Sequence, residues 1–315
     1  RPFSGREVRR IAKEVQSLRA ESVAVCLLFS FLRARHERLL RDALKPLPVS
    51  TSHEVLAEFR EFERASTTVL DAYVKPLVAR YLGDLRAAMG RDFLVMKSGG
   101  GVASQREVLR RPVDLVLSGP AGGVAAAVVL SRASRWRNLV TFDMGGTSAD
   151  FSTVVRGRPQ WTTEASVETF PLALPVVDIE SVGAGGGSLA RLDRGGALRV
   201  GPESAGADPG PMAYGKGGRE PTVTDADLIG GVLGPSLLGG RLPLDASLSR
   251  KGLDALASDL RVPADEAVLG VQQGVQASMS KAIRLILAKH GLDPRDFVLL
   301  AFGGAGPMHA CALAR

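Results

Sequence analysis

A loop near the middle of the chain has the residue types and spacing to bind phosphate. Residues 143–150 read Asp-Met-Gly-Gly-Thr-Ser-Ala-Asp, an Asp-x-Gly-Gly-Thr-x-x-Asp pattern. Gly145 and Gly146 would let the chain turn tightly and point backbone N–H groups into one concavity, which is a ready anion site. Thr147 adds a hydroxyl donor. The pattern therefore predicts a loop that binds the phosphates of a nucleotide.

The aspartates at the two ends of this loop could act on the same ligand. Asp143 and Asp150 would hold a hydrated Mg²⁺ against the bound phosphates, since magnesium prefers oxygen ligands. We expect the flanking apolar residues 139–142 and 151–155 to be strands, which would fix both carboxylates. A plain β-hairpin with polar ends is the alternative. The loop is not a Walker loop, because the lysine is missing.

A second glycine loop occurs late in the chain, at a predicted strand-to-helix junction. Gly303, Gly304 and Gly306 would offer N–H groups and the positive end of a helix dipole to an anion or a nucleotide. A bare turn at the start of a helix is an equally open interpretation. His309 follows the loop, and we expect it to pack or to cap rather than to catalyse.

A third glycine cluster opens another predicted helix. Ser118 and Gly119 follow residues 113–117, which we expect to form a strand. Glycines at such a junction serve either close helix–strand packing or contact with a nucleotide, and both remain open here.

The loop-rich region 183–240 could contain the residues that bind the substrate. Its glycine loop could cradle a phosphate or a small carbonyl compound, with a flexible linker as the alternative; the candidate residues are Gly185, Gly186, Gly187 and Ser188. Rigid proline turns downstream would hold Asp208 in place. Thr224 or Asp225 is expected to cap a predicted helix, and a metal or substrate role for Asp225 and Asp227 is the alternative.

Composition narrows the class of protein. The chain has 315 residues, of which 45% are apolar and 23% charged, as in globular domains. The net charge of +7 comes from scattered arginines, and aromatic residues are only 5%, which argues against nucleic-acid binding. No window approaches the ~18 apolar residues of a membrane span. We expect a cytoplasmic protein whose two cysteines are buried, reduced thiols.

Other reactive residue types show no recognisable pattern. No cysteine or histidine cluster has zinc spacing, and no Gly-x-Ser-x-Gly elbow occurs. The dipeptides His36-Glu37 and His53-Glu54 are expected to be solvated on helix starts.

Apolar segments of strand length alternate with helical patterns along the chain, which predicts an α/β protein. Long helices are expected over 61–89, with a kink at Pro76, and over 264–290. Residues 23–29 and 298–302 are expected to be strands.

These motifs, in this order, resemble the hydantoinase A/5-oxoprolinase family, which includes subunits of acetone and acetophenone carboxylases. The matching segments are 23–31 with His36-Glu37, 58–68, 97–101, 118–124, 143–150, 178–190, 200–218, 221–227 and 300–310. The resemblance implies an actin-like ATPase (ribonuclease H-like) α/β fold with a long glycine- and proline-rich insertion. Residues 143–150 would then be the second phosphate loop, and the 303–306 loop would contact the adenosine side.

The same resemblance implies a division of the chain and a reaction. Residues 1–48 would be the end of an N-terminal lobe that is largely missing, and 49–315 the ATPase domain, so we expect this piece alone to be inactive. The implied reaction is ATP-dependent hydrolysis of a cyclic amide of the 5-oxoproline or hydantoin type, with a B-type subunit or domain and in an oligomer. A ketone carboxylase subunit and a nucleotide-binding module without its own chemistry are the alternatives.

Overall fold

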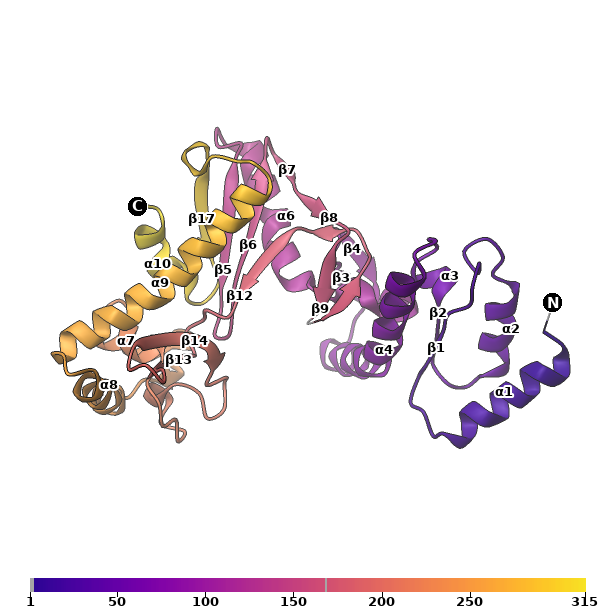
Figure 1. Cartoon of the computed structure of the whole chain (residues 1–315), viewed down its shortest axis with the longest axis horizontal. Helices are drawn as coiled ribbons and strands as arrows, with labels where there is room; N and C mark the ends of the chain where they lie inside the picture. The colour runs from indigo at the N-terminus through magenta and orange to yellow at the C-terminus, as the bar shows by residue number, and fades with distance from the viewer. Residues whose placement is uncertain (1–2, 168) are drawn as a thin grey trace. The chain divides into compact units, whose positions relative to one another are not determined.

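A computed structural model describes residues 3–167 and 169–315 (Figure 1). The chain divides into two compact units. Unit 1 holds the described residues up to 125 together with those of 161–178, and unit 2 holds 126–160 and 179–315. The family boundary predicted between residues 48 and 49 stays a prediction, because these units reflect packing and divide the chain elsewhere. The helix α6 (Ser118–Ala133) runs from one unit into the other.

Unit 1 is mainly helical, with short strands. Its helices are α1 (Gly5–Ser17), α2 (Arg35–Ala43), α3 (Ser52–Val55), α4 (Glu61–Met89) and α5 (Gln105–Arg110). The strands β1 (Val23–Val25) and β2 (Val49–Thr51) pair in parallel, and β3 (Leu94–Met96) pairs with β4 (Val102–Ser104). The strands β8 (Trp161–Thr162), β9 (Ala165–Val167), β10 (Phe170–Leu172) and β11 (Val176–Val177) complete the unit.

The helix predicted over 61–89 is confirmed as α4, which continues through Pro76 and ends at Gly90 in the left-handed conformation. The strand predicted over 23–29 is shorter than expected. The strand predicted over 113–117 is wrong: Pro112–Leu115 is a 3-10 helix, η1. The reason is a long-range contact: the Asp71 carboxylate of α4 accepts the Val113 N–H at 3.0 Å and anchors the turn.

Unit 2 is built on a five-stranded sheet. β5 (Leu139–Met144) pairs antiparallel with β6 (Ala149–Val155) and parallel with β17 (Val298–Phe302). β12 (Ile179–Val182) and β7 (Arg158–Pro159) pair antiparallel with β6. The strands predicted over 139–142, 151–155 and 298–302 are therefore confirmed.

Helices pack on this sheet, and a hairpin packs on one of these helices. The long helix α9 (Ala264–Lys289) packs on β6, β12 and β14, and confirms the helix predicted over 264–290. The region expected to be loop-rich contains more regular structure than predicted: the hairpin β13 (Ser188–Leu192) and β14 (Leu198–Ser204), the helix α7 (Val223–Ile229) and the short strands β15 (Ser236–Leu237) and β16 (Leu242–Pro243). Helices α8 (Ala246–Leu260) and α10 (Gly306–Leu313) complete unit 2.

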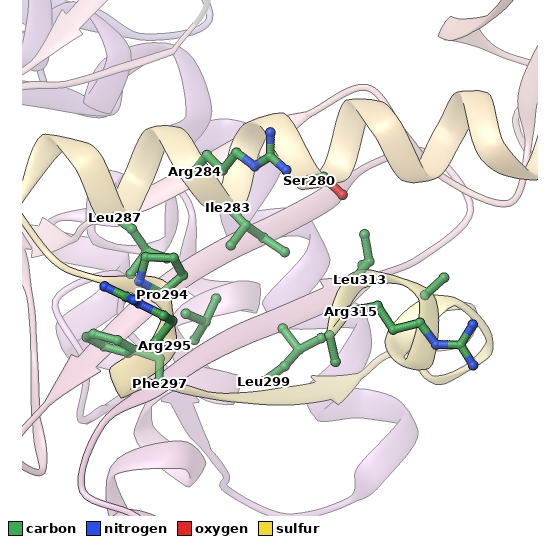
Figure 2. A pocket seen from close by; sticks show the side chains of 13 residues that line it. Ser280, Ile283, Arg284, Leu287, Pro294, Arg295, Phe297, Leu299, Leu313 and Arg315 are labelled. Carbon is green, nitrogen blue, oxygen red and sulfur yellow. The ribbon is translucent and has the colours of Figure 1, made fainter.

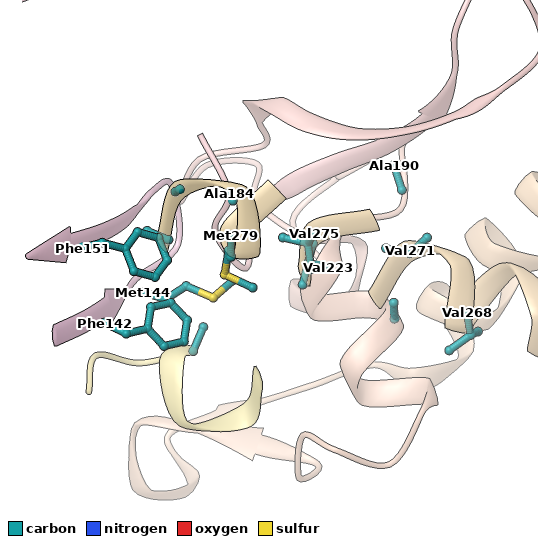
Figure 3. Close-up of a cluster of buried hydrophobic side chains, with 14 of the residues drawn as sticks. Phe142, Met144, Phe151, Ala184, Ala190, Val223, Val268, Val271, Val275 and Met279 are labelled. Atoms are coloured by element: carbon teal, nitrogen blue, oxygen red, sulfur yellow. The ribbon is translucent and has the colours of Figure 1, made fainter. Parts of the chain in front are cut away.

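One apolar core holds these elements together (Figure 3). Phe142 and Phe151 face one another across β5 and β6 with their rings stacked, their centroids 5.1 Å apart. Met144 and Met279 lie beside them, and Val275 continues the core along α9. Alternate residues of β5 and β6 therefore anchor the hairpin, so the loop that joins the two strands projects from a fixed base.

Two expectations from composition can be compared with this structure. Among the described residues, no helix is long and apolar enough to cross a membrane. The expectation that both cysteines are buried is wrong: Cys26 is half-buried and Cys311 is exposed, both as free thiols. Cys311 lies two residues after the buried His309 on α10, which turns it to the opposite face of the helix.

The mixed α/β architecture agrees with the predicted fold class. Parallel pairing of β5 with β17 joins segments that are more than 150 residues apart in the sequence. The two predicted nucleotide loops follow these two strands, so the sheet decides whether they meet.

Candidate functional site: an exposed glycine turn

The loop that joins β5 to β6 is an exposed turn between two aspartates. Asp143 and Asp150 are directly opposite one another in the strand register. The Gly145 N–H donates to the Ser148 carbonyl at 3.1 Å and closes the turn. Residues 145–147 are all exposed. The polar groups predicted to bind phosphate therefore stand free of the core.

The sequence suggests that Gly145 and Gly146 are needed for a tight turn, but the backbone of this turn does not require glycine. Neither Gly145 nor Gly146 has a φ in the left-handed region. A Cβ atom added at either position would meet no other atom within 4 Å. Neither the turn nor its packing therefore requires glycine. What glycine leaves here is open space beside the backbone, which a ligand can approach closely.

The two aspartates repel one another. Burial raises the pKa of Asp143, and the charge of Asp150 raises it further. Among the described residues, neither carboxylate forms an ion pair with lysine or arginine, and no group of three or more metal-ligating side chains occurs. Two adjacent, partly exposed carboxylates suit Mg²⁺, which takes one or two carboxylates and fills its remaining positions with water and phosphate oxygens.

The late glycine loop lies against this turn within unit 2. Phe302, the last residue of β17, is in register with Asp143, and the Ala305 N–H donates to the Met144 carbonyl at 2.9 Å. Gly303 has φ +83°, and a Cβ there would overlap the Asp143 carboxylate and the Met144 backbone. Glycine is therefore required at 303 by packing and by backbone conformation.

The exposed part of the late loop faces the solvent beside the turn. Gly303 and Gly304 are exposed, whereas Gly306 is buried at the start of α10. Of the three predicted nucleotide contacts, two have accessible backbone, and the third serves the packing of the helix. The structure thus brings the two predicted loops to one edge of the sheet.

The 185–188 loop, which is predicted to bind the substrate, donates hydrogen bonds to the backbone of the turn at 145–147. The Gly186 N–H donates to the Gly145 carbonyl at 3.0 Å, and the Gly187 N–H donates to the Gly146 carbonyl at 2.7 Å. A Cβ at Gly185 would lie 2.6 Å from Gly146 backbone atoms. Ser188 is buried, and its hydroxyl accepts the Gly185 N–H at 2.9 Å. These residues hold the turn in place, and their contact with a substrate stays a prediction.

The acidic residues downstream divide into structural and exposed groups. Asp225 accepts the N–H groups of Met212, Ala213 and Thr222 and the hydroxyl of Ser249. It forms a capping box with Thr222, the N-cap residue, so a capping role is confirmed for Asp225, whereas Thr224 lies inside the helix. Asp208 is exposed in the loop after β14, so its predicted role stays open.

His309 is buried, in agreement with the expected packing role. Its Nε2 atom lies 3.3 Å from a carboxylate oxygen of Asp227, whose other oxygen accepts a hydrogen bond from Gln272. These three side chains tie α7, α9 and α10 together.

Ser118 and Gly119 belong to unit 1, at the first turn of α6. Leu117 before them has φ +64°, which turns the chain into the helix. Their predicted contact with a nucleotide stays a prediction.

A groove of about 500 Å³ elsewhere in unit 2 is separate from the turn (Figure 2). It lies between α9, β17 and the end of α10, with Ile283, Phe297 and Leu299 on its walls. None of its lining residues belongs to the turn or to the two glycine loops.

Sequence reasoning missed a polar centre in unit 1. The expectation that His36-Glu37 and His53-Glu54 are solvated is wrong for two of the four residues: Glu37 is completely buried, and the His53 side chain is 8% exposed. Nothing in the spacing of the two dipeptides signals that Glu37 and His53 meet, because 16 residues separate them.

Known proteins resemble this chain along nearly its whole length. It is 37% identical over 93% of its length to the caprolactamase alpha subunit of Pseudomonas jessenii and 34% identical over 99% to the acetophenone carboxylase gamma subunit of Aromatoleum aromaticum. It is 32% identical to 5-oxoprolinase 1 of Arabidopsis thaliana in an alignment that covers 100% of this chain and 27% of the 5-oxoprolinase.

Solved structures give the same result for the fold. A nucleotide-free acetone carboxylase chain aligns with 99% of this chain, with a TM-score of 0.84 and 28% identity. The aligned region is 47% of the acetone carboxylase chain. The ATP-dependent caprolactamase of Pseudomonas jessenii matches 99% with a TM-score of 0.80 and 34% identity, again over 47% of its length. The chain spans about half the length of the first curated relatives it matches. The hydantoinase/oxoprolinase family model matches residues 64–315, and the chain belongs to this family.

Proposed function

We propose that the protein to which this chain belongs uses ATP to open a cyclic amide of the 5-oxoproline or hydantoin type. The observation that carries the proposal is the exposed turn at 145–147, with glycines that neither backbone conformation nor packing requires, between paired aspartates. Relatives whose names describe a caprolactamase and a 5-oxoprolinase support the cyclic amide as substrate.

In this proposal each part of the turn has a role. The N–H group of Gly146 and the hydroxyl of Thr147 bind phosphate oxygens, as main-chain concavities bind anions. The Gly145 N–H closes the turn by donating to the Ser148 carbonyl. Asp143 and Asp150 hold Mg²⁺, which neutralises charge on the phosphates when it is bound.

Other loops complete the nucleotide and substrate sides. Gly303, Gly304 and the helix start at Gly306 lie on the adenosine side. The 185–188 loop fixes the turn and, with Asp208, borders the substrate.

The chemistry follows from the weak electrophilicity of an amide. Resonance makes the carbonyl of a lactam a poor target for water. Transfer of the γ-phosphoryl group of ATP to the carbonyl oxygen gives an imidate phosphate and ADP. Water adds to the imidate carbon, and the ring C–N bond then breaks as the nitrogen takes up a proton, which leaves an open-chain acyl phosphate. A second water molecule hydrolyses this acyl phosphate to the carboxylate and phosphate. The residues of the turn contribute position and charge neutralisation. A B-type subunit or domain completes the reaction, within an oligomer in the cytoplasm.

The test is ATP hydrolysis by the full-length protein with its B-type partner. We expect 5-oxoproline, a hydantoin or caprolactam to raise the rate of phosphate release, and Asp143→Asn to abolish that increase. ATP binding without stimulation by any cyclic amide would remove the proposal and leave a nucleotide-binding module.

Carboxylation of a ketone is the second candidate. The TM-score of 0.84 to acetone carboxylase and the identity to an acetophenone carboxylase subunit favour it. Turnover of acetone or acetophenone that requires both ATP and bicarbonate would establish this candidate in place of the first.

A further inference from the structure

The hydrogen bonds behind the turn at 145–147 decide where its N–H groups point. The Gly145 carbonyl accepts the Gly186 N–H at 3.0 Å, and the Gly146 carbonyl accepts the Gly187 N–H at 2.7 Å. The peptide bonds of the turn are trans, and in a trans peptide the carbonyl of one residue and the N–H of the next point in opposite directions within one plane. The N–H groups that follow these two carbonyls therefore point away from the glycine loop behind the turn.

These two successive N–H groups are free to bind a ligand. They belong to Gly146 and Thr147, which are exposed, and neither N–H has a hydrogen-bond partner among the residues that the structure describes. Adjacent N–H groups that point to the same side form a concavity for an anion. A residue that fixes the carbonyls behind them also fixes the direction of the pair.

Thr224 of α7 holds a peptide group of the loop behind the turn. Its N–H donates to the Gly186 carbonyl at 2.7 Å, and its hydroxyl donates to the same oxygen at 2.8 Å. A Cβ at Gly186 would lie 2.8 Å from this hydroxyl oxygen, so glycine is what allows the two groups to come so close. Thr224 is buried and is not the cap of α7, so its hydroxyl serves the loop.

These contacts form one path through two peptide groups. The Gly186 carbonyl that Thr224 holds shares its peptide group with the Gly187 N–H, which donates to the Gly146 carbonyl. That carbonyl shares the next peptide group with the N–H of Thr147. Hydrogen bonds in such a chain polarise one another, and each orients the next group. The path therefore runs from the hydroxyl of a buried threonine to an exposed N–H of the turn.

The N–H of Gly146 lies outside this path. The Gly145 carbonyl that orients it is held by the Gly186 N–H, and the carbonyl in the peptide group of that donor belongs to Gly185. The Gly185 carbonyl accepts the Ser188 N–H at 3.0 Å. The two free N–H groups of the turn therefore depend on different partners, and the one of Gly146 is an internal reference for any effect of Thr224.

We propose that Thr224 is a positioning residue for the nucleotide, because it directs the N–H of Thr147 at a phosphate oxygen of ATP through the 186–187 peptide. This inference rests on the proposed binding of ATP at the turn. It adds the main chain of Thr147 to the groups that bind phosphate, and it gives α7 a role in nucleotide binding although Thr224 does not touch the ligand.

The first test is ATP binding by variants of the full-length protein, measured by isothermal titration calorimetry. Thr224→Val keeps the shape and the N–H but loses the hydroxyl, and should weaken ATP binding about 3- to 10-fold, the range of one hydrogen bond. Thr224→Ser keeps the hydroxyl and should bind ATP within about 2-fold of the wild-type protein. Thr68→Val is the matched control, because Thr68 is also a buried helical threonine whose hydroxyl donates to a main-chain carbonyl, at 2.7 Å.

A second measurement separates positioning from a general loss of stability. In the full-length protein without nucleotide, ¹⁵N labelling of threonine and glycine makes the N–H signals of Thr147 and Gly146 observable by NMR. Thr224→Val should shift the Thr147 signal and leave the Gly146 signal nearly unchanged, and Thr224→Ser should keep both signals in place. A structural defect alone would move the two signals alike.

Three results would overturn the inference. These are wild-type ATP affinity in Thr224→Val, an equal loss of affinity in Thr224→Ser or Thr68→Val, and a Thr147 signal that does not move in Thr224→Val. Absence of stimulation by any cyclic amide, with ATP binding still weakened by Thr224→Val, would remove the proposed function and support this inference. Stimulation by a cyclic amide together with wild-type ATP affinity in Thr224→Val would remove this inference alone.

Discussion

The two polar centres of this chain are built in opposite ways. In unit 2, the turn at 145–147 exposes backbone groups and almost no side chain. In unit 1, charged side chains are buried: Arg64 donates to the Ser30 hydroxyl at 2.7 Å, and Ser30 lies 2.8 Å from Ser52, which donates to Glu37. The first centre is local in sequence, whereas the second joins residues from four segments.

Because of this difference, we expect substitutions at the two centres to have different effects on stability and on ligand binding. Changes at the exposed turn should affect ligands and leave the fold intact. Changes in the buried chain of hydrogen bonds should affect the fold first, because each member satisfies another that water cannot reach.

The largest expected effect is the loss of Arg64. Arg64→Met removes the donors to Ser30 and to the Leu27 carbonyl, and should lower the free energy of unfolding by about 3–5 kcal/mol. Chemical denaturation measures it. The control is Arg60→Met at the exposed start of the same helix, whose ion pair with Glu63 at 3.6 Å should contribute less than ~1 kcal/mol. Equal losses in the two variants would contradict the distinction.

The next effect concerns the ligand. Gly146→Val should weaken ATP binding more than ~100-fold, because the side chain fills the space where phosphate approaches, whereas unfolding should change little. Isothermal titration calorimetry measures the affinity. Gly234→Val is the matched control, since Gly234 is also exposed, has no positive φ and has no atom within 4 Å of an added Cβ. Unchanged affinity in Gly146→Val would identify the turn as a plain hairpin.

Gly185 tests the support behind the turn. Gly185→Ala places a Cβ against the Gly146 backbone and should destabilise unit 2 by about 1–3 kcal/mol, as overpacking does. Gly146→Ala, on the other side of the same contact, meets no atom and should cost little. Thermal unfolding of the two variants compares them, and equal melting temperatures would refute the assigned contact.

The smallest effect is electrostatic. Because the pKa of Asp143 is raised, its ionised form opposes folding at neutral pH, and this penalty fades as the pH falls toward the raised pKa. Asp150→Asn should therefore increase the free energy of unfolding at pH 7 in magnesium-free buffer, by less than ~1 kcal/mol, and not at pH 3. The same variant should weaken Mg·ATP binding. A loss of stability at pH 7 would show that the two carboxylates do not repel one another.

Much of unit 2 could be predicted from the sequence. The strands β5, β6 and β17 and the helix α9 follow from apolar runs and helical periodicity, and the turn between Asp143 and Asp150 follows from local spacing. The strand predicted over 113–117 failed because Asp71, more than 40 residues away, captures the Val113 N–H, and no local pattern carries that information.

The sequence by itself determined the α/β class, the family and the position of the exposed turn at 145–147, because these depend on residues close together in the chain. The tertiary structure alone decided that Gly303 lies against Asp143, that the 185–188 loop supports the turn, and that Glu37 and His53 form a buried pair. The physical reason is that burial and long-range hydrogen bonds arise only when distant segments pack. The residue type alone does not show whether a glycine serves a ligand or a neighbouring backbone.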